Sequence, residues 1–280
     1  MNLALSLAAS EENENTGLGE WIQNHLQDSQ EWHLPFGIHL HLPTFEPINF
    51  LGVTIDLSIS LHVVMLWIAS LILILMFWLS FRKEKAVPTG FAALLESLVL
   101  FVRDDIAIPN MGSKNGKKLT PYLCTIFFFI LTLNLMGLIP LFTTATGNIS
   151  VTAGLAIITF VLTQLNGMKE NGVVGYMKSL VPGGVPVFLL PIMIPIEFIG
   201  LFTKPFALAI RLFANMTAGH TVIFALLGLI IVLSTLFVSP VSIAFALFIS
   251  ILEILIAFIQ AYIFTILSAL FIGMAMHPEH

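Results

Sequence analysis

Charge and cysteine are scarce in this chain of 280 residues. Only 10% of its residues are charged, against about 25% in soluble domains, and 58% are hydrophobic. This composition excludes a soluble globular domain and predicts an integral membrane protein. The single cysteine, Cys124, excludes an internal disulfide and any metal site that needs several cysteines. Its apolar surroundings favour a core residue over a reactive thiol.

Lys and Arg are absent from residues 1–56, which contain eight Asp or Glu. We therefore expect an acidic arm and no affinity for nucleic acid. The opening MNLALSLAAS lacks the basic region of a secretory signal, so cleavage there is not supported. His39 and His41 alternate and could flank a strand, but no acid or cysteine completes a coordination set. We favour a solvated or subunit-contacting arm over a metal site, and we predict no cofactor.

Residues 57–81 form the first apolar run of the length that crosses a bilayer, about 20 residues. His62 is its one ionisable side chain. The basic residues then gather on one side of the predicted topology, and the positive-inside rule puts the N-terminus outside and the C-terminus inside. Nine of them fall in segments that we expect at the inner face, and none in outer segments: Arg82, Lys83, Lys85, Arg103, Lys114, Lys117, Lys118, Lys169 and Lys178.

The remaining segments complete an all-α integral membrane protein. We expect an amphipathic segment on the inner surface over 82–119, a transmembrane hairpin over 120–165, an inner loop over 166–186 and a long, steeply tilted helical hairpin over 187–280. Its first apolar run holds about 50 residues, which would span about 75 Å as a helix against a hydrocarbon thickness of about 30 Å. The helix must therefore tilt, bend or break. The predicted bends are at its prolines, Pro191, Pro195 and Pro205.

The first half of this hairpin carries ionisable side chains at expected membrane depth, where such residues are functional candidates. Glu197, Lys204 and Arg211 follow one another at intervals of seven, so they share one helix face, which Asn215 continues. His220 is nine residues from Arg211 and falls on another face. Glu197 and Lys204 could form an ion pair, but no acid lies one turn from Arg211. We therefore expect its carboxylate partner elsewhere, including on another subunit.

The returning half carries Glu253 and Gln260, again seven residues apart. An antiparallel pairing of His220 with Glu253 and a pairing of Arg211 with Gln260 both centre near residue 236, inside the predicted turn STLFVSP. One hairpin therefore satisfies both pairings. A purely structural alternative stays open, in which the His–Glu pair is a hydrogen bond and Asn215 and Gln260 join helices.

The segment PFALAIRLFANMTAGH resembles subunit a of the F-type ATP synthases, the membrane stator beside the rotating c-ring. The resemblance extends to IPIEFIGLFTKP, LEILIAFIQAYIFTIL and NLMGLIP, and it covers roughly residues 57–276. It implies a subunit without catalytic chemistry of its own and without a cofactor, in an energy-transducing membrane. A bacterial inner membrane is the favoured location and the mitochondrial inner membrane the alternative. The implied partners are the c-ring, the peripheral-stalk b subunits and other ATP synthase subunits.

The resemblance also implies roles for individual residues. Arg211 would be the essential stator arginine that faces the c-ring carboxylate, and Glu197 would lie near the inner half-channel. The outer half-channel and the surroundings of the arginine would involve Asn215, His220, Glu253 and Gln260. The function implied is proton translocation through two offset aqueous half-channels. The alternatives are a sodium-translocating version, an independent ion transporter and a purely structural assembly subunit.

Overall fold

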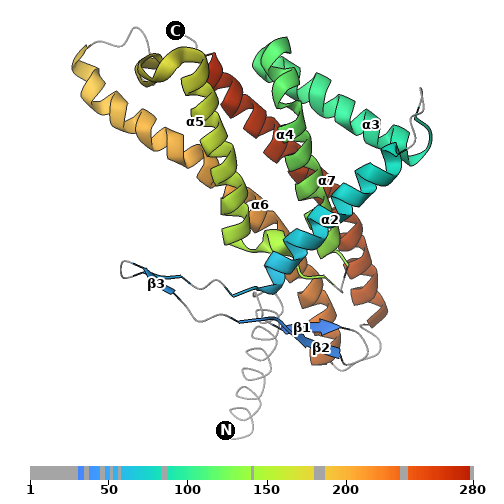
Figure 1. Ribbon diagram of the computed structural model, residues 1–280. Coiled ribbons are helices and arrows are strands. Elements are labelled where there is room, and N and C mark those ends of the chain that lie inside the picture. The colour runs from blue at the N-terminus through green and yellow to red at the C-terminus, as the bar shows by residue number, and fades with distance from the viewer. Residues whose placement is uncertain are drawn as a thin grey trace, which may run out of the picture. The chain divides into compact units, whose positions relative to one another are not determined.

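The structure, a computed structural model, describes nine ranges of the chain: 31–34, 38–44, 48–50, 53–55, 58–82, 88–139, 142–179, 187–233 and 239–277. Most of the predicted acidic arm, including the opening segment, lies outside these ranges. The described part contains five helical segments that are long and apolar enough to cross a membrane, which confirms the all-α membrane class (Figure 1). These are Leu61–Phe81, Phe91–Gly137, Ile149–Ser179, Leu190–Ile230 and Ser239–Met276.

The chain divides into two compact units, each described here by itself. Unit 1 consists of Met1–Ile68, Leu133–Asn148 and Ala214–Ala257, and unit 2 of Ala69–Thr132, Ile149–Phe213 and Phe258–His280. Two short antiparallel pairs of strands precede the helices of unit 1. Their bounds are β1 (Glu31–Leu34) with β2 (Ile38–His41), and β3 (Ile48–Phe50) with β4 (Val53–Ile55).

The helices follow in the order α2 (Leu61–Phe81), α3 (Phe91–Phe101), a π-helical segment η2 (Val102–Ala107), α4 (Ile108–Gly137), α5 (Ile149–Ser179), α6 (Leu190–Leu233) and α7 (Ser239–Met276). Short 3-10 turns, η3 (Ala145–Gly147) and η4 (Val187–Leu189), precede α5 and α6. Pro240 occupies the first turn of α7, where the missing amide hydrogen costs no helical bond.

Glycines set the bends at the ends of the membrane helices. Gly112 in α4 has φ 75° and ψ 164°, a conformation that side-chain-bearing residues rarely adopt, and α4 is kinked there. Residues 108–111 of α4 are thus separated from the rest of that helix and continue α3 and η2, within the region predicted to lie along the inner surface. Gly172 bends α5 in the same way, with φ 70° and ψ 160°.

The region predicted as an inner loop over 166–186 differs in the structure, because α5 remains helical through Ser179. Gly172 interrupts the helix with a kink, and residues 173–179 then form a second helical stretch. Of the predicted alternatives for the long apolar run, a break is not observed between Leu190 and Leu233, where α6 is one helix. It runs for 44 residues with Pro195 and Pro205 inside it.

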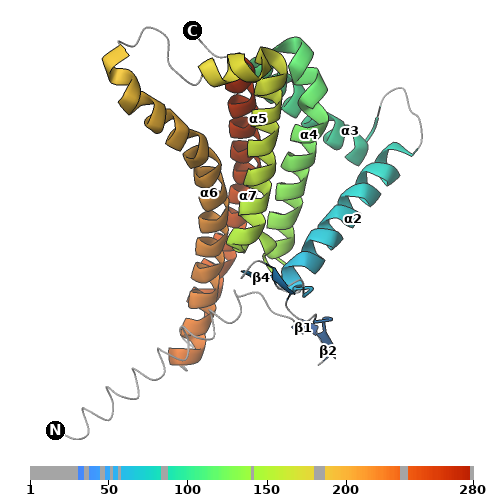
Figure 2. The same cartoon turned by 60° about the vertical axis from the view of Figure 1, so that its left-hand side comes forward.

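The core of unit 2 is built where α4, α5 and α7 lie side by side (Figure 2). Phe127 and Phe264 are fully buried there, and Phe127 packs edge-on against Phe258 at 5.7 Å between ring centroids. Small residues allow close approach of the backbones. An added Cβ at Gly273 would collide with the carbonyl of Asn110. In a membrane such packing, rather than exclusion of water, holds helices together.

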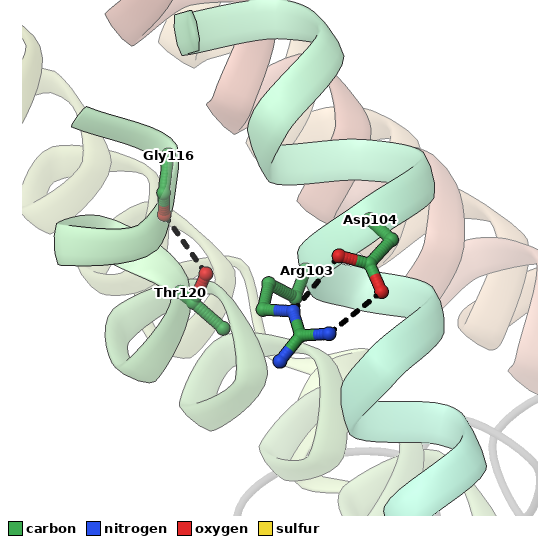
Figure 3. A network of polar contacts seen from close by, with 4 residues as sticks. All are labelled: Arg103, Asp104, Gly116 and Thr120. Atoms are coloured by element: carbon green, nitrogen blue, oxygen red, sulfur yellow. Dashed lines mark hydrogen bonds and ion pairs between the residues drawn. The ribbon is translucent and has the colours of Figure 1, made fainter. Parts of the chain in front are cut away.

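Arg103 in η2 is neutralised by its neighbour in the chain. Its Nε and Nη2 donate to the two carboxylate oxygens of Asp104 at 2.8 and 2.9 Å (Figure 3). In the same view the Thr120 hydroxyl donates a hydrogen bond to the Gly116 carbonyl at 2.8 Å, within α4. Arg103 is therefore an arginine whose charge is balanced locally.

Candidate functional site

Helix α6 presents two different faces along its length. One face is buried, and its residues follow at intervals of four: Leu208, Leu212, Met216 and His220. The other is exposed and carries Arg211 and Asn215. Nine residues make two and a half helical turns, so His220 and Arg211 point to opposite sides of α6. His220 is buried and Arg211 is exposed, as the spacing predicts.

Small side chains surround the exposed arginine on its helix face. Ala207, Ala214 and Ala218 lie four residues before, three after and seven after Arg211, and all three are exposed. The sequence reading overlooked them, although the spacing was present in PFALAIRLFANMTAGH. Small residues at such intervals let a second helix approach closely.

The charge of Arg211 is not balanced within the described part of the chain. No Asp or Glu there forms an ion pair or hydrogen bond with it, in contrast to the Arg103–Asp104 pair. An arginine keeps its proton under all ordinary conditions. The exposed face of α6 thus carries a permanent positive charge between alanines, with apolar Phe206 and Ile210 beside it.

His220 and Glu253 meet in unit 1, as the antiparallel register predicts. Nδ1 of His220 lies 3.4 Å from Oε1 of Glu253, and their side chains are only 8% and 5% exposed. His220 Nε2 and both oxygens of Glu253 have no hydrogen-bond partner among the described residues. Buried polar atoms of this kind normally bind protein groups or water. These three atoms can therefore still form hydrogen bonds with a further group.

Gly219 makes this contact sterically feasible. The Glu253 carboxylate rests against its backbone, and an added Cβ would collide with Oε1. Thr217 contributes a further buried hydroxyl, which has no hydrogen-bond partner among the described residues. The sequence reading missed both residues, because only the fold shows which glycine faces the glutamate.

Other polar side chains of unit 1 lie around the turn between α4 and α5. Thr146 donates to Oδ1 of Asn134 at 2.8 Å, and Nδ2 of Asn148 lies 3.3 Å from Nδ1 of His62. Both His62 and Asn134 are buried. His62, the one ionisable residue predicted in the first span, is thus part of a polar cluster rather than of a lipid-facing surface.

Unit 2 contains a polar cavity between α5, α6 and α7, with a volume of about 260 Å³. Glu197 and Lys204 line it from α6, and the described structure does not join them in an ion pair. Lys204 instead places Nζ 5.7 Å from the centroid of the Phe271 ring. The ion-pair alternative for these two residues therefore has no support, and both remain available to the cavity.

Gln260 is also in unit 2, on the buried face of α7 with 2% exposure. That Gln260 lies opposite Arg211 in the hairpin stays a prediction. The roles of Asn215 and Gln260 also stay predictions.

These features define a multi-pass membrane protein with ionisable groups inside its long helices, a property of proteins that move ions. The family model described as ATP synthase A chain matches residues 63–273, and the chain belongs to this family. It is 53% identical to the ATP synthase subunit a of Chloroherpeton thalassium over 264 residues, which cover 92% of this chain and 77% of the relative. The ATP synthase subunit a of Myxococcus xanthus is 49% identical over 264 residues, or 91% of this chain and 87% of the relative. That of Pelodictyon phaeoclathratiforme is 48% identical over 273 residues, or 94% and 78%.

Family membership identifies an ion-translocating stator subunit that does not itself catalyse a reaction, in an energy-transducing membrane.

Proposed function

We propose that this chain translocates protons in a rotary ATP synthase and presents Arg211 to the carboxylates of a c-ring. The observation that carries the proposal is the position of Arg211 on an exposed, alanine-flanked face of α6, with no carboxylate partner among the described residues. A carboxylate on a neighbouring helix is the complement that this face lacks.

Close approach of that helix is supported by the side chains around the arginine. Ala207 and Ala214 add little bulk one turn to either side of Arg211. The guanidinium attracts the ionised carboxylate, and because it cannot lose its proton it also blocks direct passage of a proton past it. Ring subunits would thus pass Arg211 one at a time, each in its charged form.

The outer half-channel is assigned to the His220–Glu253 pair. Histidine exchanges protons near neutral pH more readily than other side chains, and a buried carboxylate beside it can accept or return the proton. A proton delivered by this pair neutralises a ring carboxylate. The neutral form can then turn into lipid, where the ionised form would be costly.

The inner half-channel is assigned to the cavity lined by Glu197 and Lys204. After nearly a full revolution the ring carboxylate would release its proton there, because an aqueous cavity stabilises the ionised form. The membrane potential supplies about 2.3 kcal/mol per charge for each 100 mV, so several protons can drive the formation of one ATP in the catalytic head. Asn215 and Gln260 are assigned to the surroundings of Arg211.

The partners and the placement in the membrane follow from the same proposal. The chain contacts the c-ring directly and is held by peripheral-stalk b subunits. Its N-terminus is outside and its C-terminus inside, because nine Lys and Arg fall in the segments assigned to the inner face. We assign it to a bacterial inner membrane.

The decisive test compares two arginines of the same chain in the assembled complex. Arg211→Gln should abolish ATP-driven acidification of membrane vesicles, whereas Arg103→Gln, which removes a locally paired arginine, should leave it near the wild-type rate. Assembly is checked by copurification of the c-ring and the catalytic head. Normal acidification by an assembled Arg211→Gln complex would refute the proposal, and copurification of neither partner would favour an independent transporter.

A further inference from the structure

The cavity in unit 2 has a polar wall that the proposed function does not use. Besides Glu197 and Lys204, its lining includes Thr163 and Gln164 from α5. A volume of about 260 Å³ provides room for several water molecules, and water occupies cavities that offer it polar partners.

One of the two polar atoms of the Gln164 amide has a hydrogen-bond partner among the described residues. Its Oε1 accepts a hydrogen bond from the Tyr176 hydroxyl at 2.9 Å. Its Nε2 is buried and has no acceptor among the described residues. Leaving a buried amide nitrogen without an acceptor is unfavourable, and the cavity that Gln164 lines is the space that can hold one. Water is an acceptor that such a cavity can hold.

Tyr176 reaches Gln164 because the chain folds back after Gly172. The positive φ of Gly172 turns residues 173–179 against the preceding part of α5, and the Tyr176 ring packs directly on Gly167. An added Cβ at Gly167 would collide with that ring. Tyr176 is 3% exposed, so its hydroxyl has a fixed position.

Asn171 fastens this bend to the end of α7. Its Nδ2 donates to the carbonyls of Ala275 and Met276, at 3.1 Å each. Carbonyls at the end of a helix lack partners within the helix, so a side-chain donor stabilises them. The cavity wall from Gln164 to Tyr176 is therefore rigidly attached to α7.

We propose that Gln164 is a positioning residue of the inner proton pathway, which binds water in this cavity while Tyr176 fixes the orientation of its amide. The inference rests on the proposed function for its role in transport. Hydration of the cavity can be measured without any transport.

The test of hydration replaces single residues of α5 by cysteine in the assembled complex. Cys124, the one native cysteine, is first replaced by serine. Thr163→Cys and Gln164→Cys face the cavity, whereas Val161→Cys and Leu165→Cys are matched controls at exposed apolar positions of the same helix. A small, water-soluble thiol reagent should modify the cavity positions about tenfold faster or more, because thiols ionise and react in water and not in hydrocarbon.

Equal rates at the cavity and control positions would overturn the inference. If Gln164→Cys does not assemble, Thr163→Cys decides alone. Loss of pumping in Arg211→Gln together with equal labelling rates would leave the proposed function standing and remove only the role of Gln164. Selective labelling together with normal pumping by Arg211→Gln would refute the proposed function and leave the hydration of the cavity standing.

The positioning role has its own measurement. Tyr176→Phe keeps the ring on Gly167 and removes the hydroxyl, and Gln164→Met keeps the length and removes the amide. Each should lower passive proton conduction through the membrane sector about fivefold, the factor that corresponds to one net hydrogen bond. The double variant should be no slower than the slower single, because both act on one amide. Multiplied losses, or full conduction in Gln164→Met, would contradict the role.

Discussion

Oε1 of Glu253 lies 3.4 Å from Nδ1 of His220, across the hairpin that α6 and α7 form, with both side chains buried. The two residues are 33 positions apart in the sequence and lie on consecutive helices. Three of their buried polar atoms have no hydrogen-bond partner in the part of the chain that the structure describes, so the contact leaves hydrogen-bonding capacity unused.

A double-mutant cycle tests whether this pair relays protons. His220→Ala and Glu253→Ala should each slow ATP-driven acidification by about a hundredfold, the usual contribution of a positioned acid or base. The double variant should be no worse than the product of the two single effects. Ser250→Ala is the control on α7, because its hydroxyl donates to the Ala246 carbonyl within the same helix. A full-rate Glu253→Ala enzyme would support a purely structural contact.

Gly219→Ala should damage the same pair without touching either side chain. The added methyl group occupies the place of the Glu253 carboxylate, and the resulting overpacking costs about 1–3 kcal/mol. Acidification should slow while the complex still assembles. Gly200→Ala is the matched control, since an added Cβ there meets no atom within 4 Å. Equal rates for the two variants would show that Glu253 does not need this approach.

Ala207→Leu tests the close approach of a partner helix to Arg211. A larger side chain one turn away should hold the partner off and weaken the attraction between guanidinium and carboxylate, which falls with distance. We expect acidification to fall at least severalfold. Ile210→Leu, an exposed neighbour of unchanged volume, is the control. Wild-type coupling in Ala207→Leu would place the partner on another face of α6.

Acidification should not depend on sodium. The outer pair offers one carboxylate and one imidazole, whereas hard cations are bound by several oxygen ligands. ATP-driven acidification measured in sodium-free buffer should therefore match that in sodium-containing buffer. A requirement for sodium, with acidification replaced by sodium uptake, would establish the sodium-translocating alternative.

The sequence was sufficient for the helical class, the family and the meeting of His220 with Glu253. Helical periodicity and a single turn determine which residues of a hairpin lie level, so this contact needed no tertiary information. The small residues around Arg211 were readable from the same spacing but were overlooked. The conformations of Gly112 and Gly172 were not readable, because a glycine inside a helix can equally remain helical.

The helical continuation of α5 to Ser179 was hidden for a related reason. Gly172 and Gly175 indicate a loop by composition, yet packing of Tyr176 on Gly167 and bonding of Asn171 to α7 stabilise helix there. Long-range contacts of this kind override local propensity. The role of Gly219 was likewise visible only once Glu253 had a position.

The bond from Asn171 to the carbonyls of Ala275 and Met276 has a consequence for biosynthesis. Those carbonyls belong to the last turn of α7. During synthesis, the bend that carries Tyr176 is made about a hundred residues before the carbonyls that hold it. This wall of the cavity can thus be completed only after α7 has been made, so a chain that stops before α7 lacks the cavity.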